Sequence, residues 1–195
     1  FAKAARHLLR QDPQVLVIGE IRDEETAGIV VRAASTGHLV ISTVHTNSAL
    51  AAIPRMADLG VEQFLLADVL RAVVGQRLLR RVCAHCATPD TDPSREPQVL
   101  TVPQHLRLTP PAWATANGCN VCSGTGYNGR VGVFETARID ASLQRAIREN
   151  VSEEHLRALA DARGFTSIMT NGLIKARAGE TSYLETVRVL GALAS

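Results

Sequence analysis

Four cysteines form two matching pairs in the middle of the chain. Cys83 and Cys86 belong to the sequence CAHC, Cys119 and Cys122 belong to CNVC, and residues 87–118 separate the pairs. A spacing of two residues lets both thiolates of a pair reach one ion, and two such pairs complete the tetrahedral four-sulfur shell of structural zinc. Because such a shell leaves no ligand position open, we expect a zinc ion here to stabilise structure and not to catalyse a reaction.

Two other interpretations of the cysteines compete with zinc. Two disulfides would need an oxidising compartment, and a redox dithiol would need one pair where the chain has two. His85 lies inside the first pair and could replace a cysteine as ligand, although we favour an ordinary loop side chain. Residues 83–122 hold little apolar sequence that could fold them, so we expect their order to depend on the metal.

A glutamate and a histidine follow two apolar stretches of the sequence. Glu20 comes directly after QVLVIG (14–19), and His45 lies near the end of HLVISTVHT (38–46). If both stretches are parallel strands, these side chains lie beyond carboxyl ends of strands, where α/β sheets bind ligands. A carboxylate there can bind a metal or orient its water, and an imidazole can hydrogen-bond a terminal phosphate. The pair therefore suggests a nucleotide site, yet a glycine-rich G-x-x-x-x-G-K-[ST] phosphate loop is absent from the sequence.

These side chains need an α/β framework to position them. The β-branched runs 14–19 and 38–46 are typical of strands covered on both faces in a parallel sheet. Between them we predict a helix, with Asp23 as its N-cap and Gly37 just beyond its last turn. Glu24 and Glu25 need no further explanation, because acids suit the first turn of a helix.

The next stretch is predicted to be helical throughout. We expect one helix to start at Asn47 as its cap, to bend at Pro54 and to end at Gly60. Apolar spacing then predicts a second helix over 61–81, whose final QRLLRR would be solvated or paired with acids. The order strand, helix, strand, helix indicates an α/β core with a right-handed crossover.

The last third of the chain returns to regular patterns after the cysteine segment. GRVGVFE (129–135) alternates like a strand, and the rest has helical spacing. We expect helices in SLQRAIREN, in SEEHLRALADARG, around GLIKARAG, and in SYLETVRVLGAL, where Ser182 and Glu185 form a capping box.

Composition excludes several classes of protein. The chain has 195 residues, 46% of them hydrophobic, which fits a folded globular protein. A net charge of +2 is too small to indicate a nucleic-acid or membrane-surface partner. No stretch has the length of a membrane-spanning helix, and the first residues lack the core of a secretory signal, so we expect a soluble, intracellular protein. Because Phe1 is not an initiator methionine and AARHLLR (4–10) already has the pattern of a helix, we expect a fragment of a longer protein.

At this point the motifs resemble a known family. VLVIGEIRDEETA (15–27) resembles the Walker B segment of the secretion ATPases of the type II secretion and type IV pilus systems. TGHLVISTVHTNSA (36–49) is similar to their histidine box. The paired C-x-x-C followed by GTGYNGRVGVFE (124–135) resembles their tetracysteine region and the glycine-rich segment after it. The motifs come in the family's order, and the resemblance extends from residue 1 almost to Ser195.

The resemblance implies an α/β fold: the C-terminal part of a RecA-like P-loop ATPase domain, with a small tetracysteine zinc-binding insertion and a C-terminal helical bundle. Residues 1–82 would hold the Walker B segment and the histidine box of the ATPase core. Residues 83–126 would form the zinc-binding insertion, and residues 127–195 the C-terminal strand and helical region.

The resemblance also assigns roles to single residues. Glu20 matches the catalytic Walker B glutamate, which helps to hold magnesium and its water. His45 matches the histidine that senses the terminal phosphate, and His38 matches the first histidine of the same box. Arg22 and Asp23 belong to the GEIRD signature, where we expect ion pairs that shape the nucleotide site. The four cysteines match the zinc ligands of the secretion and pilus-assembly branches, which argues against pilus retraction.

For the full-length protein, the resemblance implies ATP and magnesium as cofactors and a homo-hexameric motor. Such a motor works in the cytoplasm at the inner face of the bacterial inner membrane, held there by secretion or pilus assembly platform proteins. The family's Walker A loop precedes the residue that matches Phe1. We therefore expect an ATPase as the parent protein and no activity from these 195 residues alone.

A non-enzymatic interpretation stands beside this one. The chain could be a zinc-stabilised protein interaction module, either as made or by truncation. A phosphate loop in the sequence upstream of Phe1 would support the motor, and a native chain that starts at Phe1 would support the module.

Overall fold

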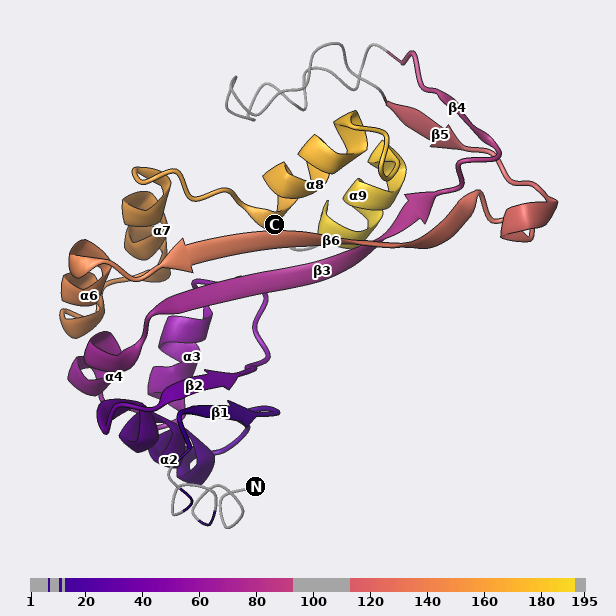
Figure 1. Cartoon of the computed structure of the whole chain (residues 1–195). Coiled ribbons are helices and arrows are strands. Elements are labelled where there is room, and N and C mark those ends of the chain that lie inside the picture. The colour runs from indigo at the N-terminus through magenta and orange to yellow at the C-terminus, as the bar shows by residue number, and fades with distance from the viewer. Residues whose placement is uncertain (1–6, 8–10, 12, 93–112, 192–195) are drawn as a thin grey trace. The chain divides into compact units, whose positions relative to one another are not determined.

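The computed structural model describes residues 7, 11, 13–92 and 113–191 (Figure 1). By their contacts these residues fall into two units, Phe1–Val73 with Ala137–Phe165, and Val74–Thr136 with Thr166–Ser195. This grouping cuts across the predicted ranges 1–82, 83–126 and 127–195, because each unit takes residues from both halves of the chain. Among the described helices, none has both the length and the apolar character that crossing a membrane requires.

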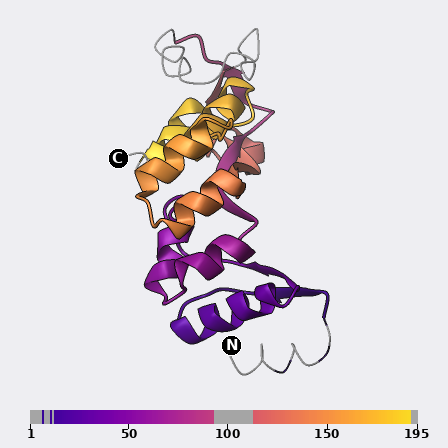
Figure 2. The same cartoon turned by 90° about the vertical axis from the view of Figure 1, so that its left-hand side faces the viewer.

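The first unit contains the predicted strand–helix–strand arrangement. Strands β1 (Val15–Ile18) and β2 (Leu39–Ser42) pair in parallel, in a register that sets Ile18 beside Ser42. Helix α2 (Glu24–Ser35) connects them and packs against β2 (Figure 2). The two helix ends are as predicted: the Thr26 N–H donates to Asp23 Oδ1 at 2.8 Å, and Gly37 adopts a φ of +101° beyond the C-cap.

The prediction that both faces of these strands are covered is wrong for the described residues. In β1, Leu16 and Ile18 are buried, while Val15 and Val17 are 50% and 72% exposed. Strand β2 likewise leaves Leu39 and Ile41 about half exposed, at 53% and 52%. Helix α2 covers one face, where its Ile29 packs with Ile18 and Val40. The sheet therefore has one packed face and one exposed aliphatic face.

Two short helices follow β2. They are α3 (Ala52–Asp58) and α4 (Gln63–Val69). The predicted cap at Asn47 is wrong, because Ala51 is the N-cap and its N–H donates to Ser48 Oγ at 3.1 Å. Pro54 is the third residue of α3, where an N–H has no partner within the helix, so the proline breaks nothing. Gly60, with a φ of +78°, follows the end of the helix as predicted.

The predicted helix over 61–81 is correct only for α4. Residues Ala72–Val82 form the long strand β3, which pairs with β6 (Tyr127–Arg138). Figure 1 shows the two strands running in opposite directions. Adjacent apolar pairs such as Leu78 and Leu79 fit the period of a helix as well as that of a strand. The apolar pattern alone therefore led to the wrong prediction of a helix. In the strand, Leu79 is buried and Leu78 is 46% exposed, because successive side chains point to opposite faces.

The first unit is completed by two helices that were predicted, α6 (Ala141–Arg148) and α7 (Glu153–Asp161). Helix α6 packs against α4 and α7. The core of the unit gathers aliphatic side chains from all these helices and includes the buried residues Leu50, Leu66, Leu143, Ile147 and Leu156.

The second unit combines the cysteine region with two helices. Strands β4 (Ala87–Pro89) and β5 (Ala114–Ala116) pair antiparallel, and the short helix η3 (Asn120–Cys122) follows. The predicted strand at 129–135 is part of β6, and α8 (Ile168–Arg177) and α9 (Tyr183–Leu190) are helices as predicted. Gly172 lets α8 and α9 approach closely, since a Cβ there would lie 2.6 Å from Leu190 Cδ1.

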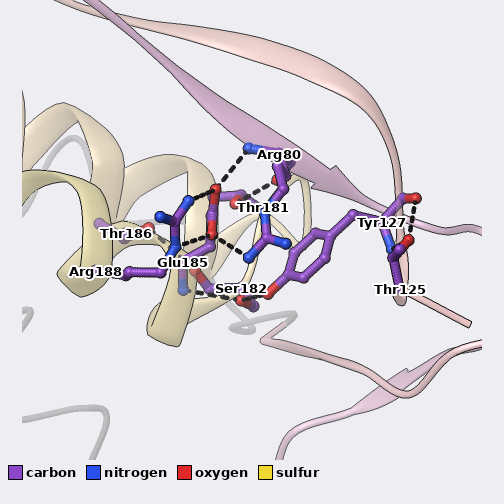
Figure 3. Close-up of polar contacts among 8 residues, drawn as sticks. All are labelled: Arg80, Thr125, Tyr127, Thr181, Ser182, Glu185, Thr186 and Arg188. Atoms are coloured by element: carbon purple, nitrogen blue, oxygen red, sulfur yellow. Dashed lines mark hydrogen bonds and ion pairs between the residues drawn. The ribbon is translucent and has the colours of Figure 1, made fainter.

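A polar network around Glu185 joins β3 to α9 (Figure 3). The Glu185 N–H donates to Ser182 Oγ at 3.1 Å, which is one half of the predicted capping box. The Glu185 carboxylate accepts instead from the side chains of Arg80 at 2.6 Å and Arg188 at 2.8 Å. Arg80 also lies over the Tyr127 ring, 4.0 Å from its centroid. Arg80, near the end of the arginine-rich run QRLLRR, is therefore paired with an acid, which is one of the two predicted outcomes. The run lies on strand β3 and not at the end of a helix.

Candidate functional site

Glu20 and His45 meet beyond the carboxyl ends of the two parallel strands. The segments after β1 and β2 stay side by side, because the Ile21 N–H donates to Thr43 O at 2.9 Å and Thr43 Oγ1 donates to Gly19 O at 2.7 Å. This places His45 Nε2 at 3.3 Å from Glu20 Oε2. The structure therefore brings together the two residues that the sequence singled out at strand ends.

Arg22 completes the cluster around Glu20. Its Nε lies 2.6 Å from the same carboxylate oxygen, Oε2. The hydrogen bond from Arg22 is the largest influence on Glu20 and lowers the pKa of its carboxyl, burial opposes it, and His45 lowers the pKa further. Glu20 is therefore ionised at neutral pH. The Arg22 and His45 side chains are 70% and 83% exposed, so both can turn toward a ligand.

His38 lies away from this cluster. It precedes β2, whereas His45 follows it, so the two histidines flank opposite ends of the strand. His38 Nδ1 is 3.0 Å from Ala33 O and 3.1 Å from Thr36 Oγ1, at the end of helix α2. Within the first unit, this contact holds the turn between α2 and β2, and a nucleotide contact for His38 stays a prediction.

The four cysteines converge in the second unit. One sulfur from each lies within 4.8 Å of all the others. The Cys83–Cys119 and Cys86–Cys122 sulfur pairs are 3.9 Å apart, and the Cys119–Cys122 pair is 3.8 Å apart. Sulfurs that each lie about 2.3 Å from a tetrahedral zinc are about 3.8 Å from one another. All four cysteines are free thiols, so the arrangement fits a four-sulfur metal site and not two disulfides.

Backbone N–H groups point at two of these sulfurs. Cys122 Sγ accepts from the Cys119 and Gly126 N–H groups, each at 3.2 Å, and Cys86 Sγ accepts from the Gly118 N–H at 3.3 Å. Burial works against ionisation of Cys122, but its N–H donors lower the pKa of the thiol to about 6. Burial instead raises the pKa of Cys86 to about 11. N–H donors of this kind stabilise thiolates, which are the form that binds a metal.

Gly118 and Gly126 are functional residues that the sequence reasoning missed. Both adopt positive φ, +107° and +76°, and a Cβ on Gly118 would lie 2.5 Å from Gly124 O. Their backbone can thus come close to the sulfurs. The signal was present in GCNVCSGTG, where glycines flank the second cysteine pair.

A family model described as "Type II/IV secretion system protein" matches residues 1–188. Similar curated proteins include a putative type II secretion system protein E of Escherichia coli K12, 43% identical over 98% of this chain and 38% of its own length. The type II secretion system protein E of Pectobacterium carotovorum is 44% identical over 97% of this chain and 37% of its own length. A type IV pilus assembly ATPase, TfpB of Acinetobacter baylyi, is 37% identical over 97% of this chain and 32% of its own length.

Solved structures share the fold. The pilus retraction motor PilT with bound ADP superposes with a TM-score of 0.65 at 24% identity, over 96% of this chain and 42% of that one. The ATPase DotB of Legionella pneumophila gives a TM-score of 0.64 at 18% identity, over 98% of this chain and 42% of that one. These likenesses show that the chain shares the α/β fold of these proteins. The chain spans 32–38% of the length of the curated relatives named above.

Proposed function

The chain belongs to the type II/IV secretion system protein family, and on that premise we propose that it is the C-terminal part of an ATPase that drives protein secretion. The observation that carries this proposal is the contact between Glu20 and His45 across adjacent strand ends, where α/β proteins bind nucleotides. An ionised carboxylate beside an imidazole suits a magnesium–triphosphate ligand, since one group can bind the metal and the other a phosphate oxygen.

Each site residue has a role in this proposal. Glu20 is the catalytic carboxylate, which would hold magnesium or orient the attacking water. His45 would hydrogen-bond the terminal phosphate, and Arg22 would move between Glu20 and the nucleotide. His38 would reach the nucleotide only if its contact with the end of α2 opened. ATP and magnesium are the cofactors that this assignment requires.

We also propose that Cys83, Cys86, Cys119 and Cys122 bind one structural zinc ion. Support comes from the tetrahedral spacing of the sulfurs and from the N–H groups that face Cys86 and Cys122. Zinc would link the turn before β4 to the turn before η3. It would make this region rigid and would take no part in ATP hydrolysis. The ranges 1–82, 83–126 and 127–195 remain our proposal for the functional parts of the chain.

Assembly and location follow from the family and are proposals for the whole protein. We propose a homo-hexamer on the cytoplasmic side of the bacterial inner membrane, held there by platform proteins of type II secretion or of pilus assembly. Relatives named for both systems support this range. The hexamer would assemble a pseudopilus or a pilus and would have no nucleic-acid partner.

Magnesium-dependent ATP hydrolysis by the whole protein tests the proposal. We expect turnover by the full-length protein and none by residues 1–195, because these carry no glycine-rich phosphate loop. Absence of both ATP binding and turnover in the full-length protein would contradict the ATPase assignment. That same absence would support the second candidate, a zinc-stabilised interaction module.

A further inference from the structure

His45 belongs to a segment that is fixed to the rest of the first unit at two points. The first point is Thr43, whose carbonyl and hydroxyl form hydrogen bonds with the residues that follow β1. The second point is Ser48, after which Ala49 and Leu50 are buried in the core of the unit. Between these points the side chain of His45 is exposed. The place of His45 therefore depends on how firmly both points are held.

The second point is a small hydrogen-bonded turn. Thr46, next to His45, donates from its Oγ1 to Ser48 O at 2.8 Å. Ser48 Oγ accepts from the Ala51 N–H at 3.1 Å, at the start of α3. A hydroxyl that accepts in this way still has a proton to donate. The group that accepts this proton is therefore linked to His45 through Ser48 and Thr46.

Glu153 of helix α7 is that acceptor. Ser48 Oγ donates to Glu153 Oε1 at 2.8 Å, although 105 positions separate the two residues in the chain. Glu153 is the first residue of α7, and Leu156 in the same helix is buried in the core that also holds Leu50. This packing fixes α7 where the carboxylate of Glu153 meets Ser48. Hydrogen bonds to a carboxylate are short and stronger than those between neutral groups, so this bond can hold the turn in place.

The usual role of an acid at a helix start does not explain this contact. Acids suit the first turn of a helix, and α7 has two of them there, Glu153 and Glu154. Within the described chain, only Glu153 of the two forms a hydrogen bond with the segment that carries His45. An exposed contact of this kind adds little to the stability of a whole protein. We therefore expect its effect to be local, on the segment itself.

We propose that Glu153 is a positioning residue for ATP hydrolysis, which keeps His45 in place at the nucleotide by holding Ser48. The proposal rests on the proposed function of Glu20 and His45. Glu153 acts through the turn and takes no part in the chemistry itself. A reacting group that moves by about 1 Å can lose up to about 100-fold in rate. Loss of the bond from Ser48 should therefore lower kcat and change KM little.

The first test measures ATP hydrolysis by the full-length protein. Glu153→Ala removes the acceptor, and we expect kcat to fall about fivefold while KM changes less than about twofold. Glu153→Gln keeps an acceptor oxygen without the charge, so its kcat should stay within about twofold of the native value. Glu154→Ala is the matched control, because it removes the neighbouring acid of the same helical turn, and it should keep the native rate. Native kinetics in Glu153→Ala would overturn the proposal.

A double variant separates the positioning of His45 from a general structural effect. In a protein that already carries His45→Ala, the addition of Glu153→Ala should lower kcat no further, because the residue that Glu153 holds in place is gone. If Glu153→Ala lowers kcat by the same factor in both backgrounds, the effect does not pass through His45, and the proposal is wrong.

Hydrogen exchange of the full-length protein, followed by mass spectrometry, tests the bond without relying on activity. Glu153→Ala should speed the exchange of amides in 44–51, and Glu154→Ala should leave them unchanged. Unchanged exchange in Glu153→Ala would contradict the proposal. An inactive native protein would overturn the proposed function and this role together. An active native protein with the same kinetics as Glu153→Ala would overturn this role alone.

Discussion

A single carboxylate holds β3 to the last helix of the second unit. Glu185 is 1% exposed and accepts from two arginines, Arg80 on the strand and Arg188 one turn along its own helix. Burial alone would raise its pKa, but these donors lower the pKa to about 2. The carboxylate is therefore ionised inside the unit, and its charge is fully paired.

Replacing Glu185 by glutamine should destabilise the second unit strongly. Glu185→Gln keeps the shape but removes the charge that Arg80 and Arg188 share, so we expect a loss of about 3 kcal/mol in the free energy of unfolding. Fluorescence of Trp113, the single tryptophan of the chain, reports on this unit in a urea titration. Glu154→Gln, at an exposed residue without a partner in the described chain, should cost less than about 0.5 kcal/mol.

The same residue should make stability depend on acid pH. A carboxyl whose pKa falls on folding stabilises the protein above its unfolded pKa, here 4.5, and this contribution disappears as pH falls toward about 2. The stability difference between the native protein and Glu185→Gln should therefore be constant above about pH 5 and shrink between pH 4.5 and pH 2. A difference that does not change over this interval would refute the charge-pairing argument.

The sequence predicted only the local part of the network around Glu185. The spacing of Ser182 and Glu185 correctly predicted the cap, because a cap joins residues within one helical turn. Arg80 is 105 positions away from Glu185, so no local pattern links them. The same limit applies to Glu20 and His45: the parallel order of two predicted strands placed each residue at a strand end, and only the structure shows their contact.

At the scale of elements, the two faces of the sheet in the first unit contribute unequally to stability. Ile18 is 7% exposed and packs on Ile29, whereas Ile41 on the neighbouring strand is 52% exposed. Ile18→Ala should cost about 2–4 kcal/mol, and Ile41→Ala less than about 1 kcal/mol, because only the first leaves a cavity. Circular dichroism suits the measurement, since both variants lie outside the unit that contains Trp113. Equal losses would mean that the second face is covered as well.

The cysteine region should depend on its metal. We expect about one zinc ion per chain by elemental analysis. Chelation should change the fluorescence of Trp113, because Trp113 O accepts from the Asp90 N–H where β4 and β5 meet. Cys119→Ser should lose the ion, and His85→Ala should keep it, because the four sulfurs alone complete the shell. Zinc-free protein with four titratable thiols and unchanged fluorescence would reject the site.

Strand β3 shows why some elements escaped prediction. Its apolar residues fit a helical period as well as a strand period, and its partner β6 starts 45 positions after the last residue of β3. Helices with strong local signals, such as α6 and α7, were predicted close to their observed bounds. The exposed face of β1 was not predicted for another reason. Both faces of that strand are apolar, and the sequence does not show which one is covered.

At the scale of the whole molecule, the family and its fold are shown, while catalysis is inferred from one cluster. The ordered motifs identified the family from sequence alone, and the family model and the solved ATPase structures agree with them. The central claim is that the carboxylate beyond β1 carries out the chemistry of a secretion ATPase.

The most direct test is the rate of ATP hydrolysis by the full-length protein with Glu20→Gln. We expect ATP binding to persist while kcat falls by about 100-fold or more, because glutamine keeps the shape but cannot act as the ionised carboxylate. Glu24→Gln, four residues along in the first turn of α2, is the matched control and should keep the native rate. Hydrolysis by Glu20→Gln at the native rate would contradict the account.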